Sequence, residues 1–159
     1  MLALLLLGAW TALIWWLMTR AHVSVGERSW WGLWARNLVH APLFGVHAAL
    51  AALVLRPGRV PGPVPAPLRD PARERSAHAR AEQRAFLVGA AVAVAYGLLV
   101  EWRQASIPRR VASGYDLLTD AVGALGVPWA LATGALLSRR AVVVLIVALA
   151  VSAAGSFLV

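Results

Sequence analysis

Three side chains of the sequence have the chemistry of acid–base catalysis: His40, Glu101 and Asp120. An imidazole oriented by a carboxylate can serve as a general base or a nucleophile, and a second carboxylate can serve as an acid. All three residues interrupt or border long apolar segments, where an ionisable group is costly and marks a candidate functional site. They are therefore the candidate catalytic residues, with either carboxylate as the partner of the histidine.

Five further residues near Glu101 and Asp120 have the chemistry of ligand binding. Gln104, Ser113 and Asp116 can hydrogen-bond hydroxyl and amide groups. Arg109 and Arg110 can bind phosphate or carboxylate, and Arg110 could stabilise developing negative charge in a reaction. The two arginines are also the expected ion-pair partners of Asp120, because an unpaired charge at the centre of a membrane helix costs about 2.5–3.5 kcal/mol.

The elements that must position these groups are membrane helices. The chain has 159 residues and is 60% hydrophobic, well above the roughly 45–50% of soluble domains. Its apolar runs predict an all-α, polytopic membrane bundle in a single domain, 1–159. The five expected spans are 2–19, 38–55, 84–101, 117–137 and 141–159, and a polar loop rich in proline and arginine occupies 56–83.

Within this arrangement the unusual polar residues should meet at one membrane face. With five spans, the loops 20–36 and 101–116 lie on the same side, and we call this the motif side. His40 then begins one helix there, Glu101 and Gln104 end the next, and Asp116 and Asp120 begin a third. A cluster at one face argues against a transporter, whose site normally lies near the bilayer midplane.

Local patterns make three further predictions about the helices. His40, Phe44 and His47 fall at i, i+4 and i+7 and should share one helical face. Gly123 and Gly126 should let neighbouring helices approach closely. The segment 57–67 is rich in proline and predicts an extended linker, whereas 72–85 reads as a solvated helix that leads into the third span and carries no site.

Composition excludes several classes of function. The sequence has no cysteine, which removes disulfides, thiolate catalysis and cysteine-bound metal. A metal held by His40, Glu101 and Asp120 is conceivable, but their spacing matches no known metal motif, so no metal or cofactor is expected. The net charge of +8 comes from arginines in the loops, which favours anionic lipid head groups over nucleic acid as partners.

Two segments of the sequence resemble a known family. Glu101-x-x-Gln104, followed by Pro108, Arg110, Ser113, Asp116 and Asp120 and by the two glycines Gly123 and Gly126, resembles the signature of the VanZ-like bacterial membrane proteins. Arg109 stands where that family usually has glycine. The segment from Asn37 to Gly45 resembles the family's second motif in His40 and the aromatic Phe44, although Arg36 and Asn37 stand where aspartate and lysine are usual.

The resemblance implies a location in the cell envelope and a role like antibiotic resistance, since the founding member is associated with resistance to the glycopeptide teicoplanin. It implies no settled biochemical activity. The expected location is the bacterial cytoplasmic membrane. Nine arginines lie on the loops opposite the motif side and six on the motif side, so the positive-inside rule places the motif side outside the cytoplasm.

Three interpretations of the polar cluster remain open at this point. In the first, a pocket binds a cell-envelope head group, such as that of a lipid-linked cell-wall precursor, or a glycopeptide. In the second, a membrane-embedded enzyme acts on a lipid-linked substrate through histidine and carboxylate chemistry. In the third, the charges pair only to tie three helices together. The sequence leaves open whether the protein is an enzyme and whether it forms oligomers.

Overall fold

Five α-helices make up the part of the chain that the structure, a computed structural model, describes: residues 1–19, 30–56, 70–107, 114–131 and 139–157. The helices are α1 (Leu2–Thr19), α2 (Trp30–Leu55), α3 (Pro71–Ala105), α4 (Gly114–Leu131) and α5 (Arg139–Phe157). The described residues contain no strand. The predicted all-α class is confirmed.

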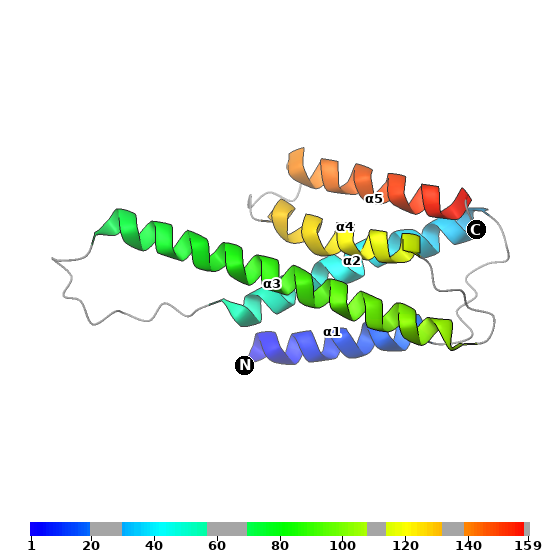
Figure 1. The fold of residues 1–159 in the computed structure, drawn as a ribbon, viewed down its shortest axis with the longest axis horizontal. Coiled ribbons are helices and arrows are strands. Elements are labelled where there is room, and N and C mark those ends of the chain that lie inside the picture. The colour runs from blue at the N-terminus through cyan, green and yellow to red at the C-terminus, as the bar shows by residue number, and fades with distance from the viewer. Residues whose placement is uncertain (20–29, 57–69, 108–113, 132–138, 158–159) are drawn as a thin grey trace.

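Successive helices run in opposite directions, so that their ends gather at two ends of one bundle (Figure 1). α2 lies in the middle and contacts each of the other four helices, whereas α1 contacts α2 and α3. The end of α1, the start of α2, the end of α3 and the start of α4 lie together (Figure 1). This is the motif side that the count of spans predicts.

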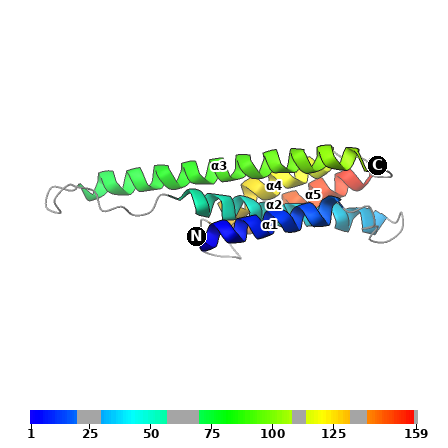
Figure 2. The same ribbon diagram turned by 90° about the horizontal axis from the view of Figure 1, so that it is seen from below.

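α3 is one continuous helix of 35 residues. It begins at Asp70, whose carboxylate accepts hydrogen bonds from the backbone N–H of Ala72 at 2.9 Å and of Arg73 at 3.4 Å, and Pro71 occupies the first turn, where proline is tolerated. At 1.5 Å per residue, α3 is about 52 Å long, and both views show it extending beyond the other helices (Figures 1 and 2). The predicted solvated helix and the third span are therefore a single element.

The other predicted boundaries agree in part. α1 matches the predicted span 2–19. α2 begins earlier than the predicted second span, at Trp30, so residues 30–36 of the predicted loop belong to this helix. The predicted linker 57–67 and the ends of the fourth and fifth spans (132–137 and 158–159) lie outside the described residues.

Three of the described segments are long and apolar enough to cross a membrane: Leu2–Thr19, Asn37–Leu55 and Ala72–Ala105. This is fewer than the five expected. α4 has 18 residues and includes Asp116 and Asp120, which lower its hydropathy.

The interior of the bundle holds one cluster of large apolar side chains around Phe44 and otherwise many small and polar ones, whereas most of the outside is covered by large apolar side chains. Ala48, Ala93 and Ala124 meet where α2, α3 and α4 pack. Many leucines and valines are exposed instead, such as Leu5 on α1, Leu98 on α3 and Leu145 on α5. This distribution is typical of helices that pack against one another in lipid, where small residues allow close approach and large ones face hydrocarbon.

Candidate functional site

A cluster of buried polar side chains occupies the motif side of the bundle. α2 contributes His40, α3 contributes Glu101 and Gln104, and α4 contributes Asp116 and Asp120, and all five are buried. They come from three different helices. The predicted convergence of these residues is therefore present in the fold.

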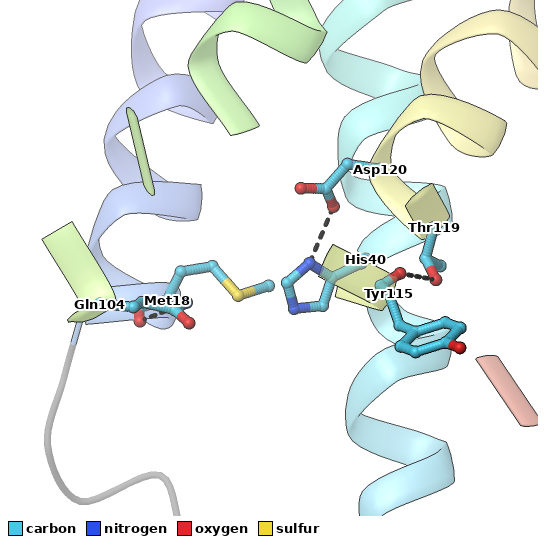
Figure 3. Close-up of polar contacts among 6 residues, drawn as sticks. All are labelled: Met18, His40, Gln104, Tyr115, Thr119 and Asp120. Carbon is cyan, nitrogen blue, oxygen red and sulfur yellow. Dashed lines mark hydrogen bonds and ion pairs between the residues drawn. The ribbon is translucent and has the colours of Figure 1, made fainter. Parts of the chain in front are cut away.

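At the centre of this cluster, His40 and Asp120 are joined by a buried hydrogen bond. The distance from His40 Nδ1 to Asp120 Oδ1 is 2.8 Å (Figure 3), and the two residues are 2% and 0% exposed. An ionised carboxylate only accepts hydrogen bonds, so with Asp120 ionised Nδ1 carries the proton and donates it. The bond fixes the ring, and it leaves Nε2 on the side of the ring away from Asp120 (Figure 3) as the atom that could exchange a proton.

Two glycines make room for this pair. A Cβ on Gly97 of α3 would lie 2.8 Å from Asp120 Oδ2, so the glycine accommodates the carboxylate. A Cβ on Gly123 of α4 would collide with the backbone of Ala41 on α2. The backbones of α2 and α4 therefore approach closely next to both members of the pair, as predicted for Gly123. Gly126 instead makes room for the side chain of Val144 on α5.

The end of α1 covers the pair from the other side. The Met18 side chain extends from α1 towards the His40 ring (Figure 3), and both residues are buried. Gln104 Nε2 donates a hydrogen bond of 3.0 Å to the backbone carbonyl oxygen of Met18. Gln104 thus holds the last turn of α1 in place over the imidazole.

A row of rings continues from His40 towards the middle of the bundle. His40 stacks on Phe44 with centroids 6.2 Å apart, and Phe44 stacks on His47 at 6.4 Å. This confirms the predicted shared face. His47 in turn stacks on Tyr96 at 5.0 Å, whose hydroxyl donates a hydrogen bond to the Thr11 carbonyl. His47 is 2% exposed, and its Nδ1 has no hydrogen-bond partner among the described residues.

Two more carboxylates act on His40 electrostatically, those of Asp116 and Glu101. In the part of the chain that the structure describes, no three histidine or acidic side chains are placed to hold a metal ion. His40, Glu101 and Asp120 are therefore not arranged as metal ligands in the described bundle. What the cluster offers instead is hydrogen-bond acceptors around one oriented imidazole.

Two grooves on the described part of the chain both lie away from this imidazole. One, of about 880 Å³, runs between Tyr96 and the face of α1 that carries Thr11 and Trp15. The other, of about 480 Å³, lies at the opposite end of the bundle between Leu55 and α3. His40 lines neither of them.

Three predicted ligand-binding residues, Arg109, Arg110 and Ser113, lie outside the described residues. The expected pairing of an arginine with Asp120 therefore stays a prediction. The partner that the structure gives to Asp120 is His40, through Oδ1. Oδ2 of Asp120 has no hydrogen-bond partner in the described ranges.

Sequence reasoning missed Met18 and Gly97 as parts of this site. Gly97 precedes Glu101 by four residues and so shares its helical face, which is a signal that could have identified it. Met18 carries no such signal, because an apolar residue at the end of an apolar helix looks like any lipid-facing residue. No family model matches the chain, and neither a curated protein nor a solved structure matches it.

Proposed function

We propose that this chain is a multi-pass protein of the bacterial cytoplasmic membrane, of VanZ-like type, and that its polar cluster binds the head group of a cell-envelope amphiphile. The ligand class is a lipid-linked cell-wall precursor or an amphiphilic glycopeptide. The observation that carries the proposal is the burial of His40, Glu101, Gln104, Asp116 and Asp120 together at one end of the bundle. The role is one of binding, as in antibiotic resistance.

All five helices cross the membrane in this proposal, including α4 and α5. The low hydropathy of α4 comes largely from Asp116 and Asp120, which are 4% and 0% exposed. Because neither carboxylate faces outward, α4 can still present an apolar surface to lipid, as exposed Leu118 and Leu125 do. The excess of arginines at the other end of the bundle favours the motif side as the extracytoplasmic one.

The chemistry of the cluster suits a ligand rich in hydroxyl and amide groups. Carboxylates accept hydrogen bonds from both, and Gln104 belongs to the same cluster. Sugars and peptides present such groups, and Arg109 and Arg110 would supply the cations for a phosphate. The VanZ-like resemblance supports this proposal through the same residues, because its motif positions Glu101, Gln104, Asp116 and Asp120 are those that the fold buries.

A membrane-embedded enzyme is the second candidate, and one specific observation favours it. The 2.8 Å bond from Asp120 to His40 Nδ1 is the arrangement in which a carboxylate orients an imidazole for proton transfer at Nε2. In this role His40 would act as base, with Glu101 as acid, on a lipid-linked substrate. We place binding first, because catalysis requires, beyond access to the cluster, that the reacting group of the substrate lie within hydrogen-bond reach of Nε2.

Binding to defined ligands tests the proposal. The full chain in nanodiscs would be titrated with a polyprenyl-diphosphate-linked muropeptide and, separately, with teicoplanin. We expect one of the two to bind, and Glu101→Gln together with Asp116→Asn to weaken that binding by at least about tenfold, as loss of charge-assisted hydrogen bonds predicts. The matched control is Glu74→Gln with Glu82→Gln, which removes the same charge from the exposed part of α3.

An equal loss of binding in the two double variants would contradict the proposal. So would a wild-type protein that binds neither of the two ligands. Conversion of the muropeptide by the wild-type protein but not by His40→Ala would favour the enzyme. A folded His40→Ala protein that retains both binding and its cellular phenotype would exclude a role for the imidazole.

A further inference from the structure

The exposed groove at the opposite end of the bundle has the composition of a phospholipid site. It has a volume of about 480 Å³ and is lined by seven residues of α2 and α3. This volume falls in the range of about 300–1,000 Å³ of small-molecule sites. The groove lies far from the motif side along the bundle, since it is formed by the end of α2 and the first half of α3 (Figure 1).

One part of the groove is cationic and the other is apolar. Arg80 and Arg84 line it, and they lie one helical turn apart on the same face of α3. Leu55, Ala85 and Val88 supply its apolar lining. Two guanidinium groups beside an apolar lining match the two parts of a phospholipid, whose phosphate is anionic and whose acyl chains are hydrocarbon.

Both arginines are available for a ligand. Neither has an ion pair or a hydrogen bond with another residue of the described ranges, and both are exposed. Glu82, the acid between them in sequence, does not line the groove. Its carboxylate instead lies 3.5 Å from His78 Nε2 and 4.0 Å from Arg56. No carboxylate of the groove therefore competes with a phosphate.

The position of the groove along α3 places it at the membrane surface. The helix is about 52 Å long and a hydrocarbon core is about 30 Å thick, so roughly 20 Å of α3 must lie outside lipid. Residues 72–84 are alanine or polar and charged residues, all exposed except half-buried Ala81, and the apolar run begins at Ala85. Arg84 therefore sits at the boundary, at the depth of a head-group phosphate.

From this arrangement we infer that the groove between Leu55 and the Arg80–Arg84 turn of α3 binds one anionic phospholipid, with its phosphate on the two arginines and an acyl chain along Leu55 and Val88. The site is independent of the polar cluster at the motif side. It would fix the depth of α3 in the bilayer and couple the end of α2 to the projecting part of α3.

Native mass spectrometry of the full chain, released from detergent, tests this inference with phosphatidylglycerol and phosphatidylcholine as the added lipids. We expect one tightly retained phosphatidylglycerol and no comparable phosphatidylcholine. Arg80→Gln with Arg84→Gln should lower phosphatidylglycerol affinity about tenfold or more, the effect of losing two charge-assisted hydrogen bonds. Helicity and thermal unfolding should not change, because both side chains are exposed.

Arg73→Gln with Arg75→Gln is the matched control, since it removes the same charge from exposed positions of α3 outside the groove. Its affinity should stay within about twofold of the wild type, as expected for surface charges. Equal losses of phosphatidylglycerol affinity in the two double variants would overturn the proposed site. They would leave only a general electrostatic attraction between arginines and anionic lipid. Displacement of the lipid by inorganic phosphate or glycerol phosphate at equal concentration would show a site for a free anion and would also overturn it.

Discussion

The backbones of Ala41 on α2 and Gly123 on α4 are in contact, and this contact brings His40 and Asp120 within hydrogen-bond distance. A Cβ on Gly123 would overlap the Ala41 carbonyl. Asp120 lies one turn before Gly123 on α4, and His40 directly precedes Ala41 on α2. The close approach therefore brings together two side chains that are 80 residues apart in sequence. A small residue, rather than a charged one, determines where the polar pair can form.

Gly123→Ala should separate α2 from α4 and destabilise the protein. Its methyl group would meet backbone, which cannot rotate away, so we expect a cost of about 1–3 kcal/mol from overpacking. Thermal unfolding in detergent measures the change. Gly114→Ala is the control, because a Cβ there meets nothing within 4 Å, and an equal loss in the two variants would contradict the close-contact explanation.

Removing one member of the buried pair should cost more than removing both. Asp120→Ala leaves the His40 Nδ1 donor without its partner, and His40→Ala leaves a buried carboxylate, which is the more costly group. We expect a coupling energy of about 1–3 kcal/mol in a double-mutant cycle followed by thermal unfolding. Additive effects of the two substitutions would show that the hydrogen bond contributes nothing to stability.

A second double variant separates a structural pair from a functional one. Well-packed apolar residues in place of both His40 and Asp120 should restore expression and stability. If the charges serve only structure, ligand binding and any cellular phenotype should return with stability. We expect them to stay lost, because the pair belongs to the proposed site.

The sequence predicted the helical class, the end of the bundle that gathers polar groups, and most members of the cluster. It could do so because the number of long apolar runs predicts the number of helices in the bundle. Successive helices run in opposite directions, so the count predicts at which end of the bundle each loop and its neighbouring residues lie. It left open whether Glu101 or Asp120 would be the partner of His40. The distance between α2 and α4, which depends on Gly123 and Ala41, gives that place to Asp120.

Packing also explains why Met18 could not be identified. Its contact with His40 depends on how the end of α1 sits against α3, through the Gln104 hydrogen bond to the Met18 carbonyl. No sequence pattern around Met18, Gln104 or His40 predicts that these residues lie together. The apolar runs give the length of a span but not of the helix that contains it, so the sequence predicts a solvated helix leading into span 84–101 without fixing the full 35-residue length of α3.

Cysteines at Ser76 and Ser106 should be modified from opposite sides of the membrane. Both positions are exposed, and they lie at opposite ends of the spanning part of α3. The natural chain has no cysteine, so each variant carries a single reactive thiol. A membrane-impermeant maleimide applied to intact cells should label Ser106→Cys, on the motif side, and should label Ser76→Cys only after lysis. Labelling of both in intact cells would contradict the proposed crossing of α3.

Gly97→Ala should displace the Asp120 carboxylate without removing any polar group. The new methyl would lie 2.8 Å from Oδ2 and 3.4 Å from a ring carbon of Phe44, so the carboxylate must move, and we expect its bond to His40 Nδ1 to lengthen or break. The ¹⁵N resonances of the His40 ring, assigned with a His40→Gln variant, report this bond directly. We expect the Nδ1 signal to shift in Gly97→Ala and to remain unchanged in Gly8→Ala, where a Cβ meets nothing within 4 Å. Ligand affinity should fall in Gly97→Ala if the oriented imidazole belongs to the site. An unchanged Nδ1 signal would mean that the Asp120 carboxylate moves while keeping its hydrogen bond to His40. Gly97 would then not position the pair.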